Sequence, residues 1–185
     1  PTRRRIFVRI QVATAPIARP MGLDKMLVPN SLLDVMRWVP TSVRLGLDDM
    51  TKPTEAQQTY AVEDAFEREM PTKTLSLTEA TTWLATIADD EGVDYPLLLQ
   101  GNLSRRTDGV AFNDEWCIAV RKKQPSELLL LHEMAHLVCA NKNHGREFRT
   151  QLVRFLRRYV SLLHAARLHE MFTSAGLSVD PFTAT

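Results

Sequence analysis

The chain has 185 residues, of which 44% are hydrophobic and 24% charged, and its formal net charge is +1. These values are typical of a globular protein that forms one domain, or one domain with an extension. The near-zero net charge argues against a whole surface that binds polyanions, and no run of about 18 apolar residues predicts a membrane span. Two cysteines, Cys117 and Cys139, cannot build a disulfide framework, so we expect a protein of a reducing compartment, the cytoplasm.

The first part of the chain, residues 1–53, reads as an extension or arm. Its basic run Arg3–Arg5 precedes an apolar stretch, as in a signal peptide, but polar residues interrupt that stretch. We therefore expect a strand over 5–12 and, after several prolines, a short helix over 31–39. The arginine cluster fits a solvated face better than a nucleic-acid site. The extension is expected to pack on the domain or on a protein partner.

A domain expected over 54–180 begins with two helices. The capping-box patterns Thr54–Gln57 and Ser76–Glu79 mark their starts. Pro71 should end the first helix, and Gly92 should end the second. Three short strands follow, over 96–100, 110–112 and 116–120, and the last two form an expected antiparallel pair.

The segment His132-Glu133-Met134-Ala135-His136 carries the strongest functional signal. It lies in an apolar stretch, 126–141, that we expect to be a buried helix with Ser126 as its N-cap. Residues four apart share a helix face, so His132 and His136 could hold one Zn²⁺, with Glu133 beside it. The alternative is a core helix with two satisfied histidines. Buried polar groups need partners, and a metal ion provides one for all three.

The third metal ligand is predicted to be His144. A catalytic zinc has three protein ligands and one open position, and His144 begins the next expected helix, Gly145–Tyr159, after a turn. Cys139 competes with it, because Cys139 lies seven residues after His132 and near the same helix face. Weaker candidates are Glu147 and Glu170.

The H-E-x-x-H motif followed by His144-Gly145-Arg146-Glu147-Phe148 resembles the motifs of SprT-like zinc metallopeptidases and of an actinobacterial family of metallohydrolases. The likeness spans about 54–180 and includes the tyrosine-containing segment Ala56–Glu63 near its start. It implies an α+β fold, a small zincin-like domain with a short antiparallel sheet packed on an active-site helix. It also implies three zinc ligands, His132, His136 and His144, with Glu133 as the catalytic base.

The expected activity is hydrolysis of a peptide or protein substrate, in which Glu133 takes a proton from a zinc-bound water and passes it to the leaving amine. A further donor should stabilise the oxyanion, and no spacing selects among three candidates, Tyr159, His164 and Arg149. An edge strand before the zinc helix could bind the substrate backbone. The residues of that expected strand are Trp116, Cys117, Ile118, Ala119 and Val120, and an ordinary core strand is the alternative.

Two other functions stay open. The extension over 1–53 favours a non-catalytic zinc-binding subunit of an assembly, although Glu133 would then have no role. A DNA-associated, SprT-like protease would use the arginine face of the helix Gly145–Tyr159. No aromatic side chains alternate with those arginines to stack on bases, which argues against nucleic acid as a partner.

Overall fold

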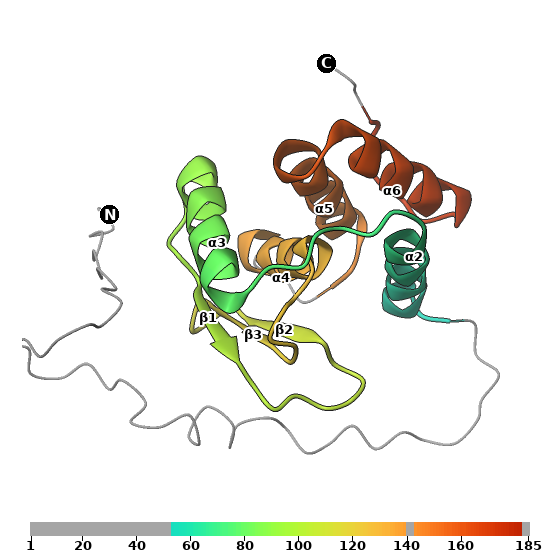
Figure 1. Cartoon of the computed structure of the whole chain (residues 1–185). Helices are drawn as coiled ribbons and strands as arrows, with labels where there is room; N and C mark the ends of the chain where they lie inside the picture. The colour runs from blue at the N-terminus through green and yellow to red at the C-terminus, as the bar shows by residue number, and fades with distance from the viewer. Residues whose placement is uncertain (1–52, 140–142, 183–185) are drawn as a thin grey trace, which may run out of the picture. The chain divides into compact units, whose positions relative to one another are not determined.

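The computed structural model describes residues 53–139 and 143–182 and has an α+β architecture, as the sequence predicts (Figure 1). The described residues all belong to one compact unit of the chain. The strand predicted over 5–12 and the helix predicted over 31–39 lie outside the described residues. None of the described helices has the length and apolar character to cross a membrane. In chain order, the elements are α2 (Glu55–Glu69), α3 (Leu77–Glu91), β1 (Leu97–Gln100), β2 (Gly109–Phe112), β3 (Cys117–Val120), α4 (Glu127–Cys139), α5 (Arg146–Tyr159) and α6 (Leu162–Ser174).

Both predicted capping boxes are present. The Thr54 side chain accepts a hydrogen bond from the Gln57 backbone, and the Gln57 side chain accepts one in return, which begins α2. Ser76 and Glu79 make the same exchange at the start of α3, and Gly92 ends that helix with a φ of 67°. A left-handed residue at this place favours glycine, because a side chain there would be strained.

The sheet is mixed, and the prediction of an antiparallel sheet is wrong in this respect. Its strand order is β1-β3-β2, with β2 antiparallel to β3 and β1 parallel to it. All four residues of β3 are buried. A strand whose residues are all buried needs a neighbouring strand on each side. β3 has both, because it lies in the centre of the sheet between β1 and β2.

The central place of β3 also overturns the expectation that 116–120 offers an unpaired edge to a substrate. Both edges of Cys117–Val120 are already paired, to β1 and to β2. Trp116 is not part of the strand. It lies in the turn before it with a φ of 50°, and its Nε1 donates a hydrogen bond to the Asp94 carbonyl at 2.6 Å. The edge strand nearest the motif helix is β2 instead.

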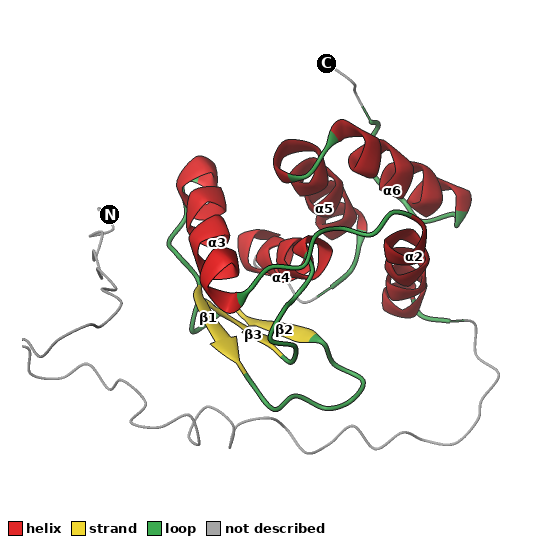
Figure 2. Ribbon diagram, in the orientation of Figure 1, coloured by secondary structure: helices red, strands yellow, loops and turns green. Residues whose placement is uncertain are grey.

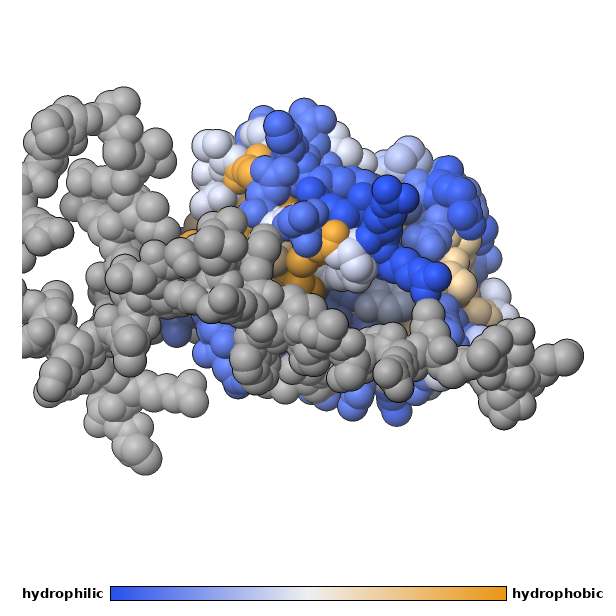
Figure 3. Space-filling view, turned by 90° about the horizontal axis from the view of Figure 1, so that it is seen from below, coloured by the Kyte–Doolittle hydropathy of each residue, from blue (hydrophilic) through white to orange (hydrophobic). Residues whose placement is uncertain are grey.

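The motif helix α4 lies at the centre of the domain. It packs against α3, α5 and β2, and the cartoon shows it between the sheet and α5 (Figure 2). Ser126 begins it, as predicted, by accepting a hydrogen bond from the Leu129 N–H at 3.2 Å. Since neighbours surround this helix, its residues are apolar on nearly every face. Hydrophilic side chains cover most of the described surface visible in Figure 3.

The C-terminal helical region consists of two helices, α5 and α6. The break falls at Val160 and Ser161, where the Ser161 hydroxyl caps α6 by accepting a hydrogen bond from the His164 N–H at 3.2 Å. The two helices then pack on each other, and α6 also packs on α2. These contacts bring α2, from the start of the domain, to the side of the structure that holds the motif.

Candidate metal centre

Three histidines converge on one point of the structure. His132 and His136 come from one face of α4, and His144 comes from the segment just before α5. Their Nε2 atoms form a triangle with all three sides 3.2 Å long. All three residues are buried, and together they could hold a metal ion.

The triangle fits a small tetrahedral cation. Zinc binds imidazole nitrogen at about 2.0–2.1 Å, so two nitrogens on a tetrahedral zinc lie about 3.3–3.4 Å apart. The observed separations of 3.2 Å are close to that value. No hydrogen-bond pattern satisfies three imidazole nitrogens equally at such distances, because each neutral ring offers only one donor and one acceptor. A shared cation resolves the conflict.

One side of the triangle is closed by Phe148. Its ring centroid lies 4.8 Å from that of His132, 4.4 Å from that of His136 and 4.8 Å from that of His144. Phe148 itself is fully buried. A ring packed on all three imidazoles excludes water from this side, so a ligand must approach from elsewhere.

The helix α2 contributes a carboxylate that sequence reasoning missed. Oε2 of Glu63 lies 2.7 Å from Nδ1 of His132, and both side chains are buried. Burial alone would lower the pKa of His132, but the charge and hydrogen bond of Glu63 outweigh it and raise that pKa. A carboxylate on the far nitrogen fixes the tautomer that leaves Nε2 free for a metal.

A second contribution of α2 is Tyr60, also missed. Its ring stacks on His132 with centroids 5.4 Å apart and lies 4.6 Å from the His144 ring. The Tyr60 side chain is 48% exposed, whereas each of the three histidines is below 9%. The approach to the histidines therefore runs past this side chain. Its hydroxyl donates no hydrogen bond to a residue in the described ranges.

The neighbours Glu133 and Gly109 meet at the sheet side of the site. A Cβ added to Gly109 would lie 2.7 Å from Oε1 of Glu133, so only glycine leaves this room. The backbone N–H of Ala111 donates to the Glu133 carboxylate. Burial raises the pKa of Glu133 to about 7, against the opposing effect of His132. A carboxyl group with such a pKa can both accept and release a proton near neutral pH.

The third histidine is held from behind by Arg149. The Arg149 side chain is fully buried and donates to the His144 carbonyl, and its Nε donates to the Ser178 carbonyl at 2.8 Å. The same guanidinium pairs with Glu55 at 2.7 Å. Burial and the nearby positive groups lower the pKa of His144 to about 3, so this ring stays neutral. Arg149 thus positions a predicted ligand and does not face the reaction as an oxyanion donor.

The other two predicted oxyanion donors have partners outside the histidine group. The Tyr159 hydroxyl donates to Glu91 of α3 at 3.0 Å, and the His164 ring is engaged by Ser161 at 2.7 Å. Among the described residues, Cys139 is not in the metal-binding group, and burial raises the pKa of its thiol to about 11. The structure brings His144 into the group in its place.

The arginine face of α5 is largely engaged within the protein. Arg154 and Arg158 both pair with Glu91, and Arg146 pairs with Asp180. These partners reduce the charge that a nucleic acid would meet. The face therefore gives little support to a DNA-associated function.

Comparison with protein-family models, with curated proteins and with solved structures finds no significant match to this chain.

Proposed function

We propose that this chain is a zinc-dependent hydrolase of peptide bonds. The observation that carries the proposal is the Nε2 triangle of His132, His136 and His144, with Glu133 on the same helix as two of them. Three protein ligands leave a position for the reaction, as catalytic zinc sites do, whereas structural zinc sites have four. A bound Zn²⁺ would polarise the substrate carbonyl and make a nearby water acidic.

Glu133 is the proposed general base. It is buried beside the histidines, and the Ala111 N–H holds its carboxylate in place. In the proposed reaction, this carboxylate takes a proton from the attacking water and delivers it to the leaving amine. Without Glu133 the three histidines would still hold a metal, but no described carboxylate would stand in the same position.

In the part of the chain that the structure describes, the outer edge of β2 pairs with no strand, and we assign it, in place of β3, to binding of the substrate backbone. The Arg121 N–H donates to the Asp108 carbonyl at 2.8 Å, so by antiparallel alternation Gly109 and Ala111 direct their backbone groups away from β3. The Ala111 N–H reaches Glu133, which puts this edge beside the site. An extended peptide can add to such an edge and bring its carbonyl to the metal.

Tyr60 is the donor that we assign to the oxyanion of the substrate. Its ring touches two of the metal-binding histidines, and burial together with the charges of Glu133 and Glu63 raises its pKa to about 12. The hydroxyl therefore stays protonated at neutral pH. A preorganised donor at this place stabilises negative charge as it develops.

The test is metal content by elemental analysis together with digestion of a mixed peptide library, read by mass spectrometry. The variants are Glu133→Gln and His144→Ala beside the wild type. We expect one zinc and peptide cleavage in the wild type, zinc without cleavage in Glu133→Gln, and loss of both in His144→Ala. Zinc in the wild type with no cleavage of any peptide would instead support a structural metal-binding subunit.

A further inference from the structure

The loop that leads into the edge strand β2 carries two arginines at the tip of a turn. The Thr107 N–H donates to the Ser104 carbonyl at 3.0 Å, and the hydroxyls of these residues lie 2.9 Å apart. Arg105 and Arg106 thus occupy the two central places of a β-turn. Both are exposed, and neither forms an ion pair with a residue in the described ranges.

Most other arginines of the described chain have a partner. Six form ion pairs with carboxylates, namely Arg121, Arg146, Arg149, Arg154, Arg158 and Arg167. Those arginines stabilise the fold by pairing elements with one another. Arg105 and Arg106 have no such role, so their charge is available to a ligand.

The turn lies close to the candidate metal centre along the chain. Asp108, which follows it, is fixed to the end of β3 by the Arg121 backbone, and Gly109 then lies against Glu133. Arg106 and Gly109 are three positions apart, with only Thr107 and Asp108 between them. At about 3.3 Å per extended residue this is at most about 10 Å, the span of roughly three residues of a bound peptide.

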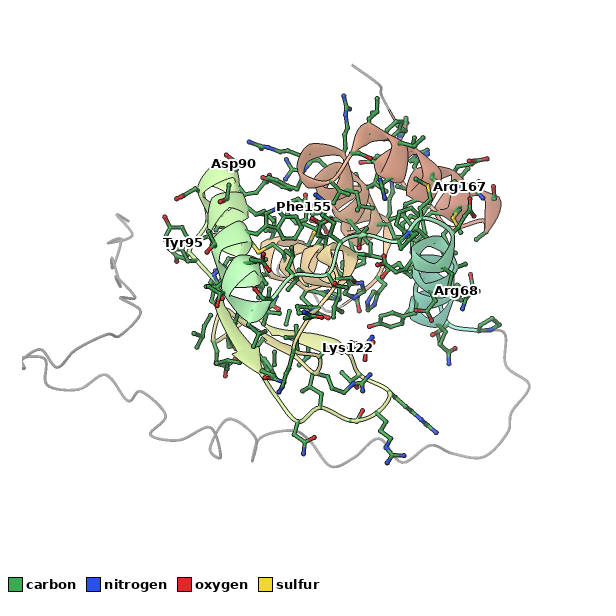
Figure 4. All side chains as sticks on the ribbon, viewed as in Figure 1. Arg68, Asp90, Tyr95, Lys122, Phe155 and Arg167 are labelled. Atoms are coloured by element: carbon green, nitrogen blue, oxygen red, sulfur yellow. The ribbon has the colours of Figure 1, made fainter. Side chains whose placement is uncertain are left out.

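The opposite end of β2 carries the opposite charge. Asp114 and Glu115 lie in the turn between β2 and β3, and both are exposed. Lys123, also exposed, adds to the positive end, where β3 finishes (Figure 4 labels its neighbour Lys122). A peptide along this edge therefore meets arginines on one side of the metal centre and carboxylates on the other.

We propose that the substrates are peptides with acidic side chains within about four residues of the cleaved bond, on the side that lies against Arg105 and Arg106. This rests on the proposed function and adds a substrate class to it. A nucleic acid fits the edge less well, since Asp114 and Glu115 would repel its backbone and no aromatic residue adjoins the arginines. Exposed pairs of this kind change affinity by about two- to fivefold each and weaken with salt.

The experiment uses four fluorescent peptides with one common centre and flanks that differ in charge. One has acidic residues before the centre, one has them after it, one has glutamines in both places, and one has lysines in both. Binding is measured to the zinc-loaded Glu133→Gln chain, and cleavage is measured with the wild type. The charge variants are Arg105→Glu and Arg106→Glu. Arg68→Glu, on α2, is the matched control, because Arg68 is also exposed and in no ion pair with a described residue (Figure 4).

We expect one of the two acidic peptides to bind and react about fivefold better than the glutamine peptide, and this preference should fade in high salt. Arg105→Glu and Arg106→Glu should each remove this preference, and Arg68→Glu should retain it. Equal binding and cleavage of the acidic and glutamine peptides would overturn the preference for acidic substrates. A preference that persists in both Arg105→Glu and Arg106→Glu would overturn the role of these arginines. Neither result contradicts the proposed peptidase activity. Tighter, Arg105-dependent binding of a DNA duplex overturns it in favour of nucleic acid.

Failure of the proposed function has a different signature. The wild type could cleave no peptide while the Glu133→Gln chain binds the acidic peptide through Arg105 and Arg106. That result would support recognition of acidic peptides and contradict the proposed hydrolysis. If no peptide is cleaved or bound, both proposals fall.

Discussion

Oε2 of Glu63, on α2, lies 2.7 Å from Nδ1 of His132, on α4, although 69 positions separate the two residues in the chain. The contact makes α2 part of the candidate metal centre. It directs the other ring nitrogen of His132 toward His136 and His144. A metal bound there would depend on a residue that the H-E-x-x-H motif does not include.

We predict that Glu63→Gln weakens zinc affinity about tenfold and that Glu63→Ala weakens it up to about 100-fold, because the carboxylate orients the ring of His132 and makes it more basic. Competition with a chromophoric chelator measures the affinity. Asp64→Asn is the matched control, since Asp64 is the exposed next residue of the same helix. Equal affinity in wild type and Glu63→Gln would contradict the role.

Gly109→Ala should lower the rate of peptide cleavage by at least about tenfold while zinc content stays at the wild-type level. The new Cβ would lie 2.7 Å from Oε1 of Glu133, and the end of that side chain can move more easily than the backbone. Gly145→Ala is the control, because a Cβ there has no atom within 4 Å. An unaltered cleavage rate in Gly109→Ala would show that the placement of Glu133 does not limit the reaction.

Glu133→Gln should stabilise the metal-free protein at pH 8 and not at pH 4.5. Burial raises the pKa of Glu133 from 4.5 to about 7, so the folded state holds a proton that the unfolded state releases between these values. The stability that this proton contributes is present at pH 4.5 and is lost as the pH rises through 7. Glutamine cannot ionise, so we expect a gain of about 2–3 kcal/mol at pH 8.

Denaturant unfolding in the presence of a chelator measures this difference, with wild type and variant compared at each pH. That comparison cancels the titration of the other groups, including His144. The same difference at both pH values would mean that the ionisation of Glu133 does not affect folding.

Tyr60→Phe should lower kcat about 100-fold with little change in KM, because it removes only a donor that acts as the oxyanion forms. Zinc content should not change, since the ring that packs on the histidines remains. Tyr95→Phe is the control, for the Tyr95 hydroxyl donates to Asp89 at the surface. If kcat is the same in Tyr60→Phe and wild type, another group stabilises the oxyanion.

Arg149→Met should destabilise the fold by about 2–4 kcal/mol and also weaken zinc binding. The substitution leaves the buried His144 carbonyl without its strongest donor and removes the link to Ser178. Arg146→Met is the control, because that arginine pairs with Asp180 at the surface and should contribute less than about 1 kcal/mol. If Arg149→Met instead lowers kcat without a change in stability, Arg149 stabilises the oxyanion after all.

Local patterns predicted the helices well and the sheet only in part. Capping boxes at Thr54 and Ser76 depend on residues three apart, so the sequence alone places them. The order of the strands depends on which strands pair with β3. Those pairs join residues far apart in the chain, so the pattern of apolar and polar residues within one strand does not predict them.

The candidate site divides in the same way. His132, Glu133 and His136 follow from helical periodicity, because four residues make about one turn of a helix wherever it packs. Glu63 and Tyr60 carried a faint signal, three positions apart in a helix with Thr59 and Phe66 on its buried side. That spacing predicts a shared face and does not name the element against which the face packs.

The amino-acid sequence alone predicts which residues share a helix face and where most helices begin, since both depend on neighbours within one or two turns. The packing of the folded chain brings His144 rather than Cys139 into the group, places Glu63 and Tyr60 beside it, and makes β2 the edge strand next to Glu133. These outcomes depend on how α2, α5 and the sheet pack around α4. Such contacts join residues far apart in the chain, and no local pattern of side chains encodes them.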